Sequence, residues 1–333
     1  MPKMVTEQLS WPIVGHRNVV NFLQRSLGNP VAAQAYIFVG PAHIGKATVA
    51  KHFINALIPG VVDITEKDNV AGHTFHPDVY WLDREVNAKT EKLKKNISIE
   101  QIRLLQNKLS LRSFLNTYKI CVISQAQHLS TEAANSLLKT LEEPNAKTIL
   151  ILLAEHLNGL PPTIVSRCQI LRFLPVATQD IFDHLLSLKI ERKKAKNLAQ
   201  LAFGRPGVAT SLAAESQRYA DYLSAAKAFL TLLKADINDK FKVAGELAKT
   251  NDTDGLSQVL DSWAAVLRDL LVMNYWSANA VAHLSLAADL EKVASVYRRD
   301  QLLHIFLKLK QTKIFLRANV NPKLALENLV LNF

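Results

Sequence analysis

The stretch GPAHIGKATVAKHF, Gly40 to Phe53, comes close to the phosphate-binding pattern GxxxxGK[ST] and decides how the first half of the chain folds. In that pattern, glycines such as Gly40 and Gly45 let backbone N–H groups surround a phosphate, and a lysine, here Lys46, reaches the outer phosphates. The apolar run AYIFV before the stretch predicts a strand, and the run TVAKHFINAL predicts a helix. The sequence therefore predicts a strand, a phosphate loop and a helix in the order that nucleotide binding requires.

The hydroxyl position of the pattern holds Ala47 instead of Ser or Thr. In a complete loop this hydroxyl ligates Mg²⁺. Thr48 lies one residue later, which on a helix is a rotation of about 100°, so we do not expect it to replace the missing ligand. The degenerate site formed by Gly40, Gly45, Lys46 and Thr48 is therefore expected to hold ATP or ADP weakly at most.

A second defect lies at the strand that should oppose the loop. The strand predicted at Ile120 to Ile123 is followed by Ser124 and Gln125, where ATP-hydrolysing folds carry acids that hold Mg²⁺ and activate water. Gln125 can orient a water molecule but cannot accept its proton, and loss of a positioned general base typically costs about 10²–10⁴ in rate. The two independent defects predict that this chain does not hydrolyse ATP usefully.

Length, charge and cysteine usage narrow the class of protein. The chain has 333 residues, 49% of them apolar, which is enough for two or three domains. Its formal charge of +11 favours polyanionic partners, although basic runs such as Lys189 to Lys196 also suit solvated helix faces. The two cysteines exclude a disulfide framework and a cysteine-rich zinc site. The N-terminus has no signal-peptide pattern and no run is long enough to span a bilayer, so we expect a cytoplasmic protein without membrane contact.

The spacing of apolar residues differs between the first and the second half of the chain. Up to about residue 175, short β-rich runs alternate with helical patterns, which predicts an α/β core with a largely parallel sheet. From about Thr178 onward every apolar pattern is helical, which predicts an all-α second half. Within the core, residues 83–96 are expected to form a charged surface loop, and Ser98 and Gln101 a capping box at the start of the next helix.

Six motifs occur in an order that resembles the delta-prime family of clamp-loader subunits of bacterial DNA polymerase III. They are QAYIFVGPAHIGKATVA, HPDVYWLD, ISIEQIRLL, STEAANSLLKTLEEPNAKTILILL, LPPTIVSRCQILRF and ANVNPKLALENLVL, and they span nearly the whole chain. The resemblance implies an AAA+ core at residues 1–175, a helical lid at 176–213 and a helical collar at 214–333 that joins a ring. It also implies partners: the delta, gamma and tau subunits of the loader, the sliding clamp reached through the complex, and primed DNA.

The resemblance also assigns a role to the motif Ser-Arg-Cys, which here is Ser166, Arg167 and Cys168. Members of this family present this arginine to the ATP site of the neighbouring subunit. An arginine supplied in trans to a transferring phosphoryl group contributes about 10³–10⁵ in rate. Arg167 is therefore the residue expected to act in catalysis. Without the resemblance it would be interpreted as an ordinary exposed arginine.

The sequence departs from the family where zinc would bind. Family members usually carry a cysteine-bound zinc module after the phosphate-loop helix, and Leu57 to Phe75 contains no cysteine. His73, His76 and Asp78 lie in or beside this region but make a poor zinc site. We expect no metal site, no zinc and no required cofactor.

Further departures affect nucleotide handling. Glu155 and His156 stand where active relatives carry a small polar residue that senses the γ-phosphate, and Val208 stands where they carry an arginine that contacts phosphate, with Arg205 nearby. Several nucleotide-handling positions are thus altered while the trans-acting Arg167 is intact.

The expected function is that of an ATPase-silent clamp-loader subunit of the replicative DNA polymerase, a nucleotidyltransferase holoenzyme. It would supply a trans arginine and a rigid element of the ring, and Lys139 is a candidate contact to duplex phosphates, although an ordinary solvated lysine is equally compatible. One alternative is a motor subunit that hydrolyses ATP with Thr48 and Gln125 as displaced ligands. Another is a DNA-binding AAA+ protein that works outside any clamp loader through its basic helices.

Overall fold

The computed structural model describes residues 11–27, 33–58, 76–86, 93–111, 113, 118–144, 147–250, 253–274, 281–318 and 320–333. Contacts between residues divide the chain into two compact units. The first comprises Met1–His184 and Gly204–Val208, and the second comprises Leu185–Phe203 and Ala209–Phe333. The predicted boundaries at residues 175 and 213 stay predictions.

The first unit is built on a five-stranded sheet in which every pairing is parallel. The strand order is β2-β3-β4-β1-β5, so the strand before the phosphate loop lies between β4 and β5. The strands are β1 (Ala35–Val39), β2 (Val79–Leu82), β3 (Lys119–Ile123), β4 (Thr148–Ala154) and β5 (Gln169–Arg172). All residues of β1, β3 and β4 are buried, as a parallel sheet covered on both faces requires. The predicted α/β fold class is confirmed.

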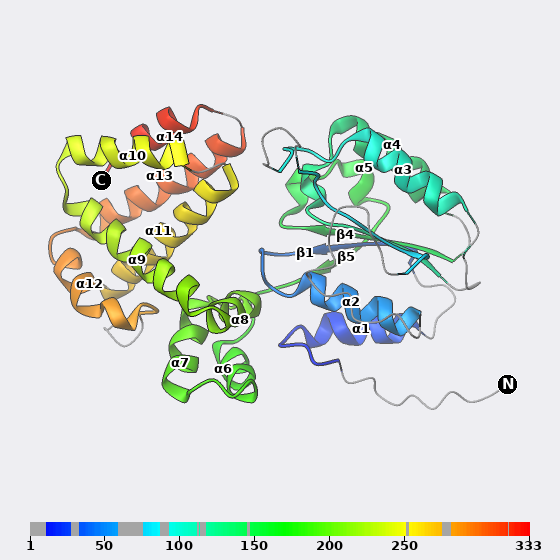
Figure 1. Cartoon of the computed structure of the whole chain (residues 1–333), viewed down its shortest axis with the longest axis horizontal. Helices are drawn as coiled ribbons and strands as arrows, with labels where there is room; N and C mark the ends of the chain where they lie inside the picture. The colour runs from blue at the N-terminus through cyan, green and yellow to red at the C-terminus, as the bar shows by residue number, and fades with distance from the viewer. Residues whose placement is uncertain are drawn as a thin grey trace. The chain divides into compact units, whose positions relative to one another are not determined.

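Helices cover both faces of this sheet (Figure 1). Tyr36 and Phe38 of β1 pack with helices on one face, whereas Ile37 and Val39 pack with helices on the other. This division follows from the alternation of side chains along a strand. The first face is covered by α1 (Arg17–Leu27) and α2 (Lys46–Leu57), and the second by α3 (Ile99–Ser110), α4 (Thr131–Glu142) and the short α5 (Pro162–Val165).

The segment before α3 differs partly from its prediction. The capping box is confirmed, because the Gln101 N–H donates to Ser98 Oγ at 3.4 Å and the Ser98 N–H donates to Gln101 Oε1 at 3.1 Å. The prediction of a charged surface loop over residues 83–96 was wrong at its start, where Arg84 is buried. Gln101 Nε2 donates to the carbonyl of Asp83 at 3.0 Å, which ties the start of this segment to α3.

The second unit is helical throughout its described residues, which confirms the predicted all-α second half. Its core includes Phe229 and Trp263, whose rings stack with centroids 4.8 Å apart, and Phe333 packs edge-on against both. The helices are α7 (Arg192–Leu201), α9 (Ser216–Lys234), α10 (Ile237–Thr250), α11 (Thr253–Met273), α12 (Ala287–Ala294), α13 (Arg299–Arg317) and α14 (Pro322–Val330). Two further helices, α6 (Thr178–Ser187) and α8 (Pro206–Ala214), contribute residues to both units.

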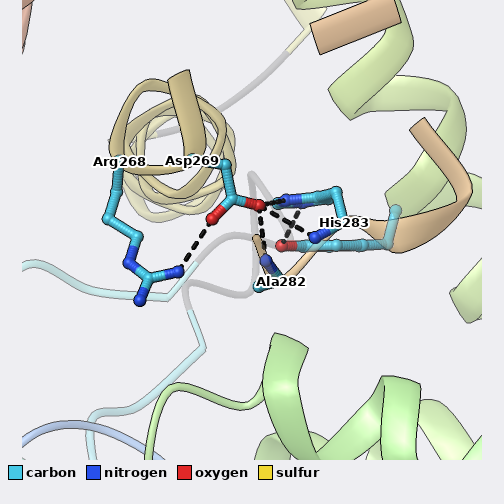
Figure 2. A network of polar contacts seen from close by, with 5 residues as sticks. Arg268, Asp269, Ala282 and His283 are labelled. Atoms are coloured by element: carbon cyan, nitrogen blue, oxygen red, sulfur yellow. Dashed lines mark hydrogen bonds and ion pairs between the residues drawn. The ribbon is translucent and has the colours of Figure 1, made fainter. Parts of the chain in front are cut away.

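A buried polar network joins α11 to the segment before α12 (Figure 2). Asp269 Oδ2 accepts hydrogen bonds from the backbone N–H groups of Ala282 and His283 and from His283 Nδ1, at 2.8 to 2.9 Å, and Arg268 donates to Oδ1 at 2.8 Å. Burial by itself raises the pKa of the Asp269 carboxyl. The hydrogen bonds from His283 and Ala282 outweigh burial, so the pKa lies below its ordinary value.

In the part of the chain that the structure describes, no helix is long and apolar enough to cross a bilayer.

Candidate functional site

The phosphate loop has the predicted strand, loop and helix around it. β1 ends at Val39, and Gly45 adopts φ 110° immediately before α2 begins at Lys46, two residues earlier than predicted. A Cβ atom added at Gly40 would lie 2.5 Å from the carbonyl oxygen of Phe173, so this position requires glycine. The glycines of the motif therefore serve the backbone geometry of the loop, whether or not a phosphate is bound.

Lys46 makes its contacts within the loop. Its ammonium Nζ donates to the carbonyl oxygen of Gly40 at 2.5 Å and to that of Pro41 at 2.7 Å. Burial lowers the pKa of Lys46 to about 8, against the opposing effect of the nearby Glu155 carboxylate. The cation that would reach the outer phosphates is thus engaged by the carbonyls of the loop itself.

The other loop positions lie as follows. Ala47 and Thr48 are exposed on the first turn of α2. Across the loop, the backbone N–H of Gly207 donates to the carbonyl of His43 at 2.9 Å, and a Cβ atom added at Gly207 would lie 2.8 Å from that oxygen. The expected lid thus touches the phosphate loop through backbone, close to Val208, which is half-buried.

Ser124 stands at the end of β3, where an acid would be needed for Mg²⁺. Its hydroxyl is buried and accepts a hydrogen bond from the Trp81 indole Nε1 at 2.7 Å. Gln125 follows in the left-handed region with φ 49° and begins a short 3₁₀ turn, η2 (Ala126–His128). Neither position brings a carboxylate toward the loop.

Asp83, at the end of β2, is the acid that sequence reasoning missed. Burial raises the pKa of its carboxyl, against the opposing effects of Arg84 and of a hydrogen bond with Ser124. The signal was present in the motif HPDVYWLD, in which an apolar strand ends in an acid. The structure brings Asp83 and Ser124 together at neighbouring strand ends, because β2 and β3 are paired in parallel.

Glu155 and His156 follow the end of β4 directly. The backbone N–H of Glu155 donates to Gln127 Oε1 at 3.3 Å, which ties this corner to the turn after β3. Its carboxylate lies close enough to Lys46 to act on the pKa of that lysine. The position expected to sense a phosphate therefore places a negative charge beside the phosphate loop.

Arg167 follows α5 and precedes β5. Its Nη2 lies 2.6 Å from Glu142 Oε1, and its Nη1 donates to the carbonyl of Thr163 at 2.9 Å. Ser166 donates its hydroxyl to the same carbonyl at 3.2 Å. Burial raises the pKa of the Cys168 thiol to about 12, so Cys168 is a neutral thiol at physiological pH. The Arg167 side chain remains 36% exposed and can be reached from outside the chain.

The remaining candidates lie apart from these groups. Lys139 is exposed in the last turn of α4. His76 Nδ1 accepts from the Asp78 N–H at 3.1 Å, and the Asp78 carboxylate accepts from Ser113 at 2.9 Å, while His73 lies outside the described residues. Across those described residues, no group of three or more histidine, cysteine or acidic side chains could hold a metal ion.

Comparison with known proteins places these features in a family. Residues 15–177 match the family described as DNA polymerase III, delta subunit. The DNA polymerase III subunit delta′ of Bacillus subtilis is 26% identical over 327 residues, which cover 94% of each chain. The chain is similar to clamp-loader subunits of DNA polymerase III over nearly its whole length. The family match covers the phosphate loop, Ser124 and Arg167, and the Bacillus subtilis relative extends the similarity through the helical unit.

Two further known proteins are similar to this chain. The subunit delta′ of Pseudomonas aeruginosa is 32% identical over 147 residues, which cover 42% of this chain and 43% of that protein. A solved structure of a DNA polymerase III gamma-subunit-related protein from Thermotoga maritima is 18% identical and covers 94% of this chain and 97% of that one, with a TM-score of 0.41.

Proposed function

We propose that this clamp-loader subunit, a component of the DNA polymerase III holoenzyme, does not hydrolyse ATP itself. It presents Arg167 to the ATP site of a neighbouring subunit, and it forms a rigid part of the ring against which ATP-hydrolysing subunits close. Its partners are the delta, gamma and tau subunits, and through the complex the sliding clamp on primed DNA. The residue ranges 1–175, 176–213 and 214–333 serve as core, lid and collar.

The environment of Ser124 is the main observation behind the proposal that this subunit does not hydrolyse ATP. An ATP-hydrolysing P-loop protein holds Mg²⁺ with an acid at this strand end and with the hydroxyl after the loop lysine. Here the first position holds a neutral hydroxyl engaged by Trp81, and the second holds Ala47. Without these two ligands the metal ion that neutralises developing phosphate charge has no built site.

The state of the phosphate loop supports the same proposal. The contacts of Lys46 with the carbonyls of Gly40 and Pro41 must break before the ammonium can reach a phosphate. Glu155 adds a negative charge beside Lys46, which disfavours a polyphosphate at this place. We therefore propose at most weak binding of ATP or ADP, with no required cofactor, no zinc and a cytoplasmic location.

Arg167 supports the trans-acting role because it is accessible and its donors are not exhausted. A guanidinium has five N–H donors in a planar fork that suits phosphate oxygens. Contacts with described residues use two of them, to Thr163 and Glu142, and three are left. Lys139, exposed on α4, is proposed as a contact to duplex phosphates inside the ring.

Reconstituted clamp loaders that carry single substitutions in this subunit test the proposal. Arg167→Ala is expected to leave assembly intact and to lower DNA- and clamp-stimulated ATP hydrolysis at the adjacent site by up to about 10³-fold. Arg167→Lys should restore little of this ATP hydrolysis, because the point charge of lysine does not reproduce the planar fork of a guanidinium. Hydrolysis is measured as phosphate release in the presence of clamp and primed DNA.

Lys46→Ala is the matched control, since it removes one cation from a site that is already disabled. It should leave clamp loading nearly unchanged, and the purified subunit alone should show negligible ATPase activity with primed DNA. A loader in which Lys46→Ala abolishes loading while Arg167→Ala loads at the unmodified rate would show a motor subunit instead.

A further inference from the structure

Arg167 is held by a carboxylate that lies 25 residues earlier in the chain. Glu142 is the last residue of α4 and Arg167 follows the end of α5, and their Nη2 and Oε1 atoms lie 2.6 Å apart. The second contact, from Nη1 to the carbonyl of Thr163, is made within the turn of α5 itself. The guanidinium is therefore contacted by two helices, by Thr163 of α5 and by Glu142 of α4.

The helix that carries Glu142, α4, is held in place by its cap, its buried face and a neighbouring helix. The helix is capped by Ser130, whose hydroxyl accepts from the Ala133 N–H at 3.1 Å, and its inner face is buried in the core. Gln106 of α3 adds hydrogen bonds to the carbonyl of Ser136 and to the hydroxyl of Thr140, at 2.8 and 2.9 Å. These contacts hold the backbone that carries Glu142, whose own side chain is 51% exposed.

The local electrostatics make a carboxylate here unfavourable without a partner. Glu142 and Glu143 stand at the last residue and the C-cap of α4, where the helix dipole is negative. An acid at such a place costs free energy unless a cation offsets it, and Arg167 is the cation that does so for Glu142. Among the described residues Glu143 has no such ion pair, although it carries the same charge one position later.

We propose that Glu142 is the positioning residue for Arg167: it fixes the guanidinium so that its three remaining N–H donors are presented to the phosphate of a neighbouring subunit. This role rests on the proposed trans-acting function of Arg167. Glu142 does not compete with the phosphate, because the planar fork can hold a carboxylate and a phosphate oxygen at the same time. A long exposed side chain without this contact would sample several rotamers and meet the phosphate less often in the productive geometry.

The first experiment is a double-mutant cycle in reconstituted loader. Glu142→Gln, which keeps the shape and removes the charge, should lower clamp- and DNA-stimulated ATP hydrolysis by about 10-fold, less than the roughly 100-fold that a 1 Å misplacement can cost. In the Arg167→Ala background the same substitution should change nothing. Glu143→Gln is the matched control, because it removes an equal charge from the neighbouring position, and it should leave the rate unchanged in both backgrounds.

The second experiment observes the side chain in the free subunit. Relaxation of the Arg167 Nε–H resonance by NMR reports its mobility on the ps–ns timescale. Glu142→Gln should increase that mobility and Glu143→Gln should not, whatever role Arg167 has in the assembled loader. A defect in folding is separated from a defect in positioning by the helical circular dichroism of the same variants.

The outcomes test the positioning role of Glu142 separately from the trans-acting role of Arg167. A large effect of Arg167→Ala with no effect of Glu142→Gln, or with a faster rate, overturns the role of Glu142 and leaves the proposed function standing. No effect of Arg167→Ala overturns both. Unchanged mobility of the Arg167 guanidinium in Glu142→Gln also overturns the positioning role, because the contact then does not restrain the side chain.

Discussion

Lys46 and Ser124 each occupy the position of a nucleotide-binding residue, but their polar atoms form hydrogen bonds with other groups of the protein. Lys46 donates to two carbonyls of its own loop, and Ser124 accepts from the indole of Trp81. In each case a polar group that a ligand would satisfy is satisfied by the protein, which avoids the cost of leaving it buried and unpaired. These contacts let the loop serve as a structural element of the fold.

Lys46 should leave a pH-dependent signature in stability. Its pKa in the folded chain is about 8, below the ordinary value of 10.5, so the charged form costs stability below pH 8 and this cost disappears as the pH rises toward 10.5. The free energy of unfolding of the wild type should therefore rise relative to that of Lys46→Met between about pH 8 and 10. Urea unfolding followed by circular dichroism at several pH values measures the difference.

The pH dependence is the informative quantity, since Met also removes the two hydrogen bonds to Gly40 and Pro41. Lys139→Met, at an exposed position of α4, controls for the loss of one lysine. A wild-type minus Lys46→Met difference that stays flat over this pH range would contradict the inward-facing lysine.

At the scale of elements, α11 carries two aspartates whose contributions to stability should differ because their surroundings differ. Asp261 and Asp269 lie on this one helix, and each is paired with a cation. Asp261 is half exposed and meets Lys313, whereas Asp269 is fully buried and also accepts from two backbone N–H groups and the His283 ring. The buried network in Figure 2 thus fastens the segment before α12 to the C-terminal part of α11.

Asp269→Ala should destabilise the chain strongly, by about 3–5 kcal/mol, because it leaves buried donors without their acceptor. Asp261→Ala on the same helix is the matched control and should cost about 0.2–1 kcal/mol, as exposed ion pairs do. Chemical unfolding at pH 7 measures both values.

The lowered pKa of Asp269 predicts how the stability difference between wild type and Asp269→Ala depends on pH. Its contribution is present above the ordinary value of 3.8 and is lost as the pH falls through the folded value, so the gap between wild type and Asp269→Ala should narrow in acid. Equal costs for the two substitutions at pH 7 would mean that the network contributes no more than a surface pair.

At the scale of the whole molecule, the helical unit has a core of its own. Its buried cluster begins at Ala226 and ends at Val330, so it is made by α9 to α14 and by residues between α11 and α12. Contacts with α7 add to it from outside, as when Asn197 donates to the Tyr219 hydroxyl at 2.7 Å. Exposed apolar side chains on α13, namely Leu303, Leu307 and Ile314, give this unit a surface that suits partner helices.

We expect residues 214–333 to fold and to suffice for assembly with other loader subunits, because their core does not depend on the sheet unit. Co-purification of this fragment with the partner subunits is the measurement, and the fragment 1–213 is the control, which should not be retained. A folded 214–333 fragment that stays monomeric in the presence of all partners would contradict this division of roles.

The amino-acid sequence by itself determined the fold class, the strand before the phosphate loop and the capping box of α3. These follow from local patterns, namely apolar runs, glycine spacing and a cap, whose physics acts within a few residues. Local patterns also identified Ala47, Ser124 and Arg167, because each is a departure from or a match to a short motif. The order of the strands in the sheet was not accessible in this way, since it depends on contacts between distant segments.

Only the tertiary structure decided which groups meet. It joined Glu142 to Arg167, Asp83 to Ser124, and Glu155 to the surroundings of Lys46, although the members of each pair lie on different elements. It also buried Arg84, which its charged neighbours had led us to place on the surface. The physical reason is common to all these cases: parallel strands and packed helices bring distant residues together, and the burial and charge that result are properties of the assembled core.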